Sequence, residues 1–177
     1  MAGTDEIIGE LLDVAARRLA AYGYLLTGSQ HAGEELVQAA IVKVFVRRRK
    51  VAGVQAAEGY VRATMRSVHI DGLRRERLWR RVAPGQLAGR EPVDDHAARI
   101  ATRDAMQRAL GSLSAQERTA VVLRYFDDLT VAQTADYMGL ALGTVKRYVS
   151  NALHKLAVEI GDHDFDVERV TVEQGRE

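Results

Sequence analysis

The apolar positions in the first half of this chain recur at helical spacing. They follow this period over residues 5–26, 31–48 and 57–81, and each segment predicts a long amphipathic helix. Residues 1–81 do not show the strict alternation of apolar and polar positions that is typical of a half-buried strand. The pattern therefore predicts an all-α fold for this part of the chain.

The helical period is lost over residues 82–100. Both prolines of the chain, Pro84 and Pro92, lie here among glycines and acidic residues. We expect a flexible linker between two helical domains, because such composition is typical of domain boundaries. The chain is thus predicted to have four parts, which are a first domain 1–81, a linker 82–100, a second domain 101–157 and an acidic tail 158–177.

Helical signals return after the linker. A helix is predicted from near Ile100, and Ser114 and Glu117 have the spacing of a capping box at the start of the next one. We expect the Asp127-Asp128 pair to end that helix. Four apolar residues before this pair are expected to pack under the segment that follows, namely Val121, Val122, Tyr125 and Phe126.

Residues 129–156 have the pattern of two helices joined by a short turn. Thr130 is placed to cap the first helix, and Gly139 lies where that helix must end. The second helix is predicted from about Leu142. Its buried stripe consists of Val145, Val149, Ala152, Leu153 and Leu156.

This segment predicts a helix-turn-helix, in which the second helix enters the major groove of DNA. Six residues remain on or near the opposite face of that helix, and they are Gly143, Thr144, Lys146, Arg147, Ser150 and Asn151. Lys and Arg can donate to guanine acceptors, and Asn can pair with adenine. An ordinary helical hairpin with a solvated basic face remains the alternative interpretation.

The net charge of +1 conceals a strong asymmetry. Residues 43–81 contain twelve Lys and Arg but only three acids, whereas residues 158–177 carry a net charge of −5. Nine excess positive charges within one segment repel one another, because they lie within about one Debye length of 8–10 Å. The basic segment therefore favours contact with a nucleic acid.

Other function classes have little support. The chain has no cysteine, and none of its five histidines makes a pair with metal-ligand spacing, so we expect no metal site and no cofactor. No nucleophile elbow or phosphate loop is present, which argues against an enzyme. No apolar run approaches the ~20 residues needed to span a bilayer, and the N-terminus lacks a signal peptide. We expect a cytoplasmic protein without membrane association.

The order of these parts resembles a bacterial RNA polymerase sigma factor of the extracytoplasmic-function (ECF) group. The motif E-E-L-V-Q at 34–38 and the arginine-rich I-D-G-L-R-R-E-R resemble region 2 of that family. L-S-A-Q-E-R-T-A-V-V-L-R-Y-F-D-D-L-T and G-L-A-L-G-T-V-K-R-Y-V-S-N-A-L-H-K-L resemble region 4. The sequence departs from the family pattern at Ala39, Ile41, Ser67 and Ser114.

The resemblance implies two contacts with promoter DNA and one set of contacts with polymerase. The loop 49–56 and the helix after it would capture the −10 element, with contacts from Arg62, Arg66, Ser67, Asp71, Arg74 and Arg75. The six residues of the second helix of the helix-turn-helix would face the −35 element. The polymerase-binding residues would be Glu35, Leu36, Val37 and Gln38.

The implied partners are therefore the polymerase core, through the β′ clamp and the β flap, and promoter DNA. By family analogy, an anti-sigma protein is a further regulator. Two other interpretations remain. One is a helix-turn-helix regulator that binds duplex DNA without polymerase. The other is a purely structural helical protein.

Overall fold

The computed structural model describes residues 4–46, 51–82 and 107–160, and these are almost entirely helical. Within them no strand occurs, so the predicted all-α class is confirmed. The helices are α1 (Thr4–Thr27), α2 (Gln30–Val46), α3 (Val54–Val82), α5 (Ala115–Val121), η1 (Val122–Phe126), α6 (Val131–Met138) and α7 (Leu142–Ile160). A further helical segment covers residues 107–111, before α5.

Helices α1, α2 and α3 pack around one apolar core. The core side chains come from the periodic positions of each helix, as the sequence predicts, and include Leu11, Leu19, Tyr22, Leu26, Leu36, Val61 and Met65. A bidentate ion pair also joins α1 to α3: Arg18 Nε and Nη2 lie 2.9 and 2.7 Å from the two carboxylate oxygens of Glu58. Arg18 is largely exposed, so we attribute most of the stability to the core.

Two glycines allow α1 and α2 to approach closely. A Cβ atom added to Gly23 would lie 2.6 Å from the carbonyl oxygen of Gly33, and one added to Gly33 would lie 2.7 Å from the backbone nitrogen of Tyr24. Any side chain at either position would collide with backbone. The α1–α2 crossing therefore requires glycine on both helices.

Helices α5, α6 and α7 form the second helical group. Leu123, Ala135, Met138, Val145 and Val149 fill its core. The predicted capping box at the start of α5 is confirmed, with reciprocal bonds between Ser114 and Glu117. The predicted cap at Thr130 is also confirmed, and Gln133 completes a capping box there that was not predicted from the sequence.

The observed ends of the helices agree in part with the ends predicted from the sequence. Gly139 ends α6 in the left-handed conformation, with φ 61°, as predicted. Helix α3 begins at Val54, inside the predicted loop 49–56, and continues one residue into the predicted linker. Helix α7 continues three residues into the predicted tail. The remaining linker residues, the predicted helix start near Ile100 and residues 161–177 of the tail lie outside the described residues.

The expected packing of Val121, Val122, Tyr125 and Phe126 under the helix-turn-helix holds only for Val121, which packs against Leu110, Leu113 and Ala152 of α7. Val122 packs instead into the core of α1–α3, and Phe126 stacks on Tyr22 of α1. Tyr125 is half exposed. Residues 122–126 form a π-helical turn, which adds a residue to the helical repeat and directs these side chains differently from a regular α-helix.

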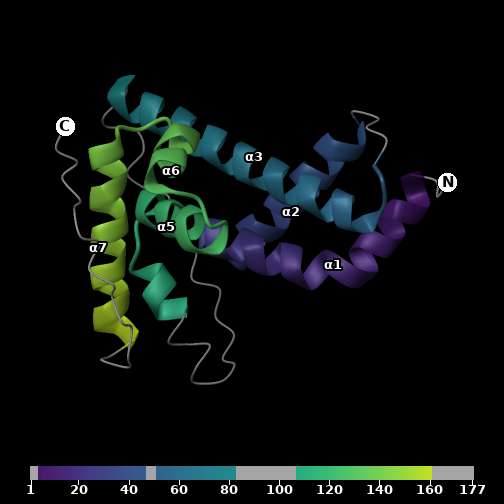
Figure 1. The fold of residues 1–177 in the computed structure, drawn as a ribbon, viewed down its shortest axis with the longest axis horizontal. Helices are drawn as coiled ribbons and strands as arrows, with labels where there is room; N and C mark the ends of the chain where they lie inside the picture. Colours follow the sequence, from purple (N-terminus) through teal and green to yellow (C-terminus); the bar gives the residue numbers. More distant parts are fainter. Residues whose placement is uncertain (1–3, 47–50, 83–106, 161–177) are drawn as a thin grey trace, which may run out of the picture.

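The two helical groups are in direct contact. Helix α5 lies against α1, and α6 lies against α3, while α7 lies on the side away from α2 (Figure 1). Ile70 of α3 is part of the core of the second group. None of the helices in the described parts of the chain is both long and apolar enough to cross a membrane.

Candidate nucleic-acid interface

The predicted −35 residues lie on one exposed face of α7. Five of them are exposed, and Thr144 is half-buried. The opposite face packs into the protein through Val145, Val149 and Ala152, which are buried. The turn at Gly139 and the start of α7 at Leu142 thus orient a face of small, polar and cationic side chains towards solvent.

The predicted −10 residues, all on α3, divide between two faces of that helix. Ser67, Asp71 and Arg75 are exposed to solvent, and Arg75 Nε donates to the Asp71 carbonyl within the same helix. Arg62 and Arg66 instead turn towards the second helical group, where they contact Asp127. The sequence places these residues on one helix but does not indicate this division.

Asp127 is the centre of a polar cluster between the two groups. Its side chain is only 6% exposed. One carboxylate oxygen lies 3.3 Å from Arg62 Nη2, and the other lies 3.2 Å from Arg66 Nη1 and 2.7 Å from the hydroxyl of Tyr22. A single carboxylate, directly after η1, therefore binds two arginines of α3 and a tyrosine of α1.

Aromatic rings lie against the arginines of this cluster. Tyr22 and Phe126 stack with centroids 5.5 Å apart, and the Arg62 guanidinium lies 4.9 and 5.1 Å from the two ring centroids. Arg66 lies 4.6 Å from the ring centroid of Tyr137 on α6. Burial and the hydrogen bond to Asp127 raise the pKa of the Tyr22 hydroxyl, so this group remains a donor to the carboxylate.

Two further arginines of α3 bind the end of α6. Arg74 Nη2 donates to the Tyr137 carbonyl at 2.8 Å, and Arg77 Nη2 donates to the Met138 carbonyl at 2.9 Å. These carbonyls belong to the last turn of α6, where orphan acceptors and the helix dipole favour a cation. Of the predicted −10 arginines, only Arg75 is clear of the second group.

Arg118 of α5 makes a second contact between the two helical groups, at the end of α1. Its buried guanidinium donates to the carbonyls of Leu110 and Leu113 and, at 2.7 Å, to the carbonyl of Thr27 at the end of α1. Burial lowers the pKa of this guanidinium. Gly28 has φ 73° and leaves space for the guanidinium, because an added Cβ would lie 2.2 Å from Arg118 Nη1.

The predicted polymerase-binding residues on α2 do not share one orientation. Leu36 is a core residue, 7% exposed, and Val37 packs against the same core. Glu35 and Gln38 are exposed, together with Val42 one turn further along. Only the exposed residues can contact a partner without a rearrangement of the core.

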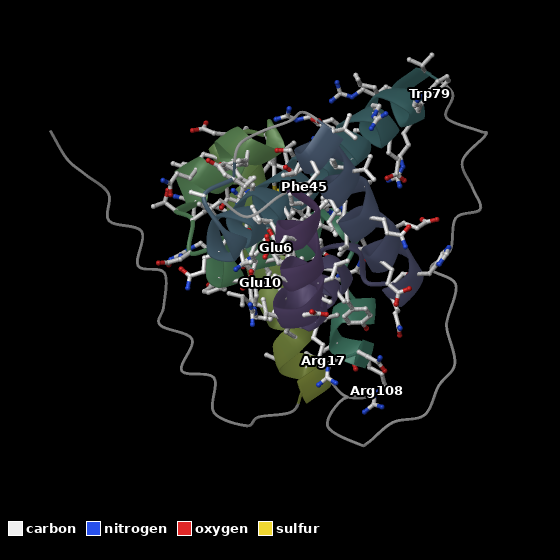
Figure 2. All side chains as sticks on the ribbon, turned by 90° about the vertical axis from the view of Figure 1, so that its right-hand side faces the viewer. Glu6, Glu10, Arg17, Phe45, Trp79 and Arg108 are labelled. Carbon is white, nitrogen blue, oxygen red and sulfur yellow. The ribbon has the colours of Figure 1, made fainter. Side chains whose placement is uncertain are left out.

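The C-terminal end of α3 exposes an aromatic side chain that lies among arginines in the sequence. Trp79 is 63% exposed, and Leu78 and Val82 beside it are also exposed. Figure 2 shows Trp79 at the tip of α3, on the opposite side of the view from Arg17 and Arg108. A flat ring among cations can stack on an unpaired base.

Among the described residues, no group of three or more His, Cys, Asp or Glu side chains is arranged to hold a metal ion. The surfaces of α3 and α7 present cations, polar side chains and an exposed aromatic ring. The cations lie on two separate helices, α3 and α7, which belong to different helical groups.

Comparisons with known proteins agree with the motifs. Residues 103–156 match the family model described as sigma-70, region 4. The RNA polymerase sigma-E factor of Streptomyces avermitilis is 28% identical over 80% of this chain and 78% of its own length. The ECF RNA polymerase sigma factor SigE of Mycolicibacterium smegmatis is 29% identical over 89% of this chain and 63% of its own length.

A solved structure supports the fold. The sigma factor RpoE from Bartonella quintana, crystallised in complex with the anti-sigma factor NepR, superposes with a TM-score of 0.57 at 22% identity. The match covers 89% of this chain and 98% of that one. The resemblance indicated by the sequence motifs is confirmed: this chain is similar to RNA polymerase sigma factors of the extracytoplasmic-function group, and its residues 103–156 match sigma-70 region 4.

Proposed function

We propose that this chain binds the core of bacterial RNA polymerase and directs transcription initiation at specific promoters, without catalysis of its own. The observation that carries the proposal is the presence of two cationic surfaces on separate helices of a sigma-factor relative. In this role residues 1–81 form a region 2-like domain, and residues 101–157 form a region 4-like domain.

Helix α7 is proposed to bind the −35 element in the major groove. Its N-terminal half presents Lys146, Arg147, Ser150 and Asn151 to solvent, while its other face is fixed in the core. A helix held in this way presents its side chains to base edges without a large loss of conformational entropy.

Helix α3 is proposed to bind the −10 element and the melted strand. Ser67, Asp71 and Arg75 are exposed along one stripe, and Trp79 extends the same helix. Cations and an exposed ring are the features that single-stranded DNA needs, since the cations follow the backbone and the ring stacks on bases.

The exposed side of α2 is proposed to dock on the β′ clamp of polymerase, through Glu35, Gln38 and Val42. The region 4-like domain would contact the β flap. An anti-sigma protein is proposed as a regulator, which is supported by the complex of the similar RpoE with NepR.

The experiment that tests the function is in vitro transcription with purified bacterial core polymerase and promoter fragments from the source genome. Initiation at discrete sites that depends on this protein is expected. A Val42→Asp variant should lose activity and fail to co-purify with core, whereas Val14→Asp, at an exposed valine of α1, should retain both. Equal activity of the two variants would argue against docking through α2.

A regulator that binds duplex DNA without polymerase is the second candidate, because the helix-turn-helix alone would suit it. That function predicts tight binding to specific duplexes by the isolated protein and no activation of core polymerase. The same transcription assay separates the two functions.

A further inference from the structure

The arrangement around Asp127 has a consequence for the accessibility of the −10 surface. The resemblance to sigma factors implies that Arg62 and Arg66 contact DNA, yet both are bound to the Asp127 carboxylate. Arg74 is likewise occupied, by the end of α6. The exposed face of α7 carries no such cover from the other helical group.

We propose that Asp127 is an intramolecular latch that holds the region 4-like domain over the −10 surface and competes with DNA for Arg62 and Arg66. The inference rests on the proposed function and adds a regulated step to it. The latch consists of Asp127, Tyr22, Arg62 and Arg66. In the latched form the −35 surface and the stripe of Ser67, Asp71 and Arg75 are accessible, whereas Arg62 and Arg66 are not available to DNA.

The charges of the latch resemble those of a protein–DNA contact. A carboxylate that accepts from two guanidinium groups takes the place that a phosphate oxygen would have on the same arginines. The carboxylate is almost fully buried, so salt screens the pair less than it screens an exposed pair. The latch and the DNA therefore cannot occupy these arginines at the same time.

Distances along DNA require the latch to open. The −35 and −10 positions are separated by about 25 base pairs, or about 85 Å at about 3.4 Å per base pair. Helix α3 has 29 residues and a length of about 44 Å. In the latched form the C-terminus of α6 abuts α3, with Arg74 Nη2 2.8 Å from the Tyr137 carbonyl. The two DNA surfaces cannot then reach both elements.

Two variants open the latch by different means. Asp127→Asn removes the charge, and Tyr22→Phe removes only the hydroxyl that donates to Asp127, so the net charge of the protein is unchanged. Asp128→Asn is the matched control for charge, because Asp128 is exposed, and its φ of 52° is one that asparagine tolerates. Circular dichroism verifies that each variant keeps its helical content.

The first measurement is the affinity for a fluorescein-labelled single-stranded DNA of mixed sequence, by anisotropy, at low salt. We expect Asp127→Asn and Tyr22→Phe to bind about tenfold more tightly than the unmodified protein, because a larger fraction is competent to bind. Asp128→Asn should bind nearly as the unmodified protein does. Equal tightening by Asp127→Asn and Asp128→Asn, with none by Tyr22→Phe, would overturn the latch.

The second measurement reports the latch without DNA. The chain has no cysteine, so Val14→Cys in α1 and His154→Cys in α7 give a unique pair of spin labels. Asp127→Asn should lengthen and broaden the label–label distance distribution, and an unchanged distribution would contradict the latch. Opening without DNA binding by any variant would support the latch and refute the proposed DNA-binding function.

Discussion

His69 is a titratable residue at the contact between the two helical groups. Its Nε2 atom lies 2.9 Å from the Thr119 hydroxyl on α5. Burial, and secondarily the charge of Arg118, lower its pKa from 6.5 to about 4. The unfolded chain therefore binds a proton at a higher pH than the folded chain, and His69 should cost stability as the pH falls from about 7 towards about 4.

The free energy of unfolding should thus decrease by about 1 kcal/mol more in the native protein than in a His69→Gln variant between about pH 7.5 and 5.5. Urea unfolding followed by circular dichroism at both pH values measures this difference. The glutamine keeps a hydrogen-bonding group towards Thr119 but does not titrate. The same pH dependence in both proteins would show that His69 is not buried in neutral form.

Individual residues also show where sequence information ends. The capping boxes at Ser114 and Thr130 were predictable because their partners lie three residues away. Asp127 was predicted only to end a helix, since its arginine partners lie 61 and 65 positions earlier. Leu36 was assigned to polymerase although it is buried, because the apolar face of its helix is wide and the sequence alone does not orient it.

At the level of helices, the α1–α2 crossing depends on its glycines. Gly23→Ala should destabilise the protein by about 1–3 kcal/mol, because the new Cβ would lie 2.6 Å from a backbone oxygen. Gly9→Ala in the same helix is the control, since nothing lies within 4 Å of its added Cβ. That variant should be stabilised by about 0.5–1 kcal/mol. Thermal unfolding of both variants tests the crossing, and stabilisation by Gly23→Ala would contradict it.

Helix α7 makes a separate prediction about DNA. Lys146→Ala or Arg147→Ala should weaken binding to the promoter duplex. If the substituted residue contacts a base, the loss of binding free energy should be about 1–3 kcal/mol and should depend on the DNA sequence. If it contacts phosphate, binding to all duplexes should weaken equally. Electrophoretic mobility shifts with matched and scrambled duplexes separate these cases. Arg17→Ala, an exposed cation of α1, should have little effect, and an unchanged affinity of the double α7 variant would remove α7 as the recognition helix.

The C-terminal end of α3 gives a further prediction about DNA binding. Trp79→Ala should reduce affinity for single-stranded DNA by about 1–3 kcal/mol if the ring stacks on a base. Leu78→Ala is the matched control, because Leu78 is adjacent and similarly exposed but has no ring. Quenching of the only tryptophan on DNA addition reports the same contact directly. If DNA does not quench the tryptophan, and Trp79→Ala and Leu78→Ala bind DNA equally well, then no base stacks on Trp79.

The positions of the long helices could be predicted from periodicity, and their ends agree to within a few residues. The π-helical turn at 122–126 could not, because its extra residue per repeat leaves no mark in a short apolar run. That turn directs Val122 and Phe126 towards α1, away from the helix-turn-helix. This part of the contact between the two groups therefore follows from a local irregularity that the helical pattern does not contain.

At the level of the whole molecule, several sets of contacts hold the two helical groups together. They include Arg118 on Thr27, the Asp127 cluster, and the two arginines of α3 on the end of α6. The composition of residues 82–100 led us to expect two domains without a fixed spacing, whereas the closed form has a definite one. Binding energy from polymerase and DNA must exceed these contacts before the domains can separate.

Addition of core polymerase should therefore lengthen the distance between labels at Val14→Cys and His154→Cys. The polymerase is proposed to bind α2 on one domain and to engage the other domain through the β flap. Both contacts favour an open form, in which the two helical groups are apart, over the closed form, in which they are in contact. Double electron–electron resonance on the labelled protein, with and without core, measures the change. The Val42→Asp variant should remain closed when core is added, because it lacks the docking contact. Identical distances in the free and the bound protein would mean that the closed form itself engages polymerase, and the −10 arginines would then have to be released by DNA alone.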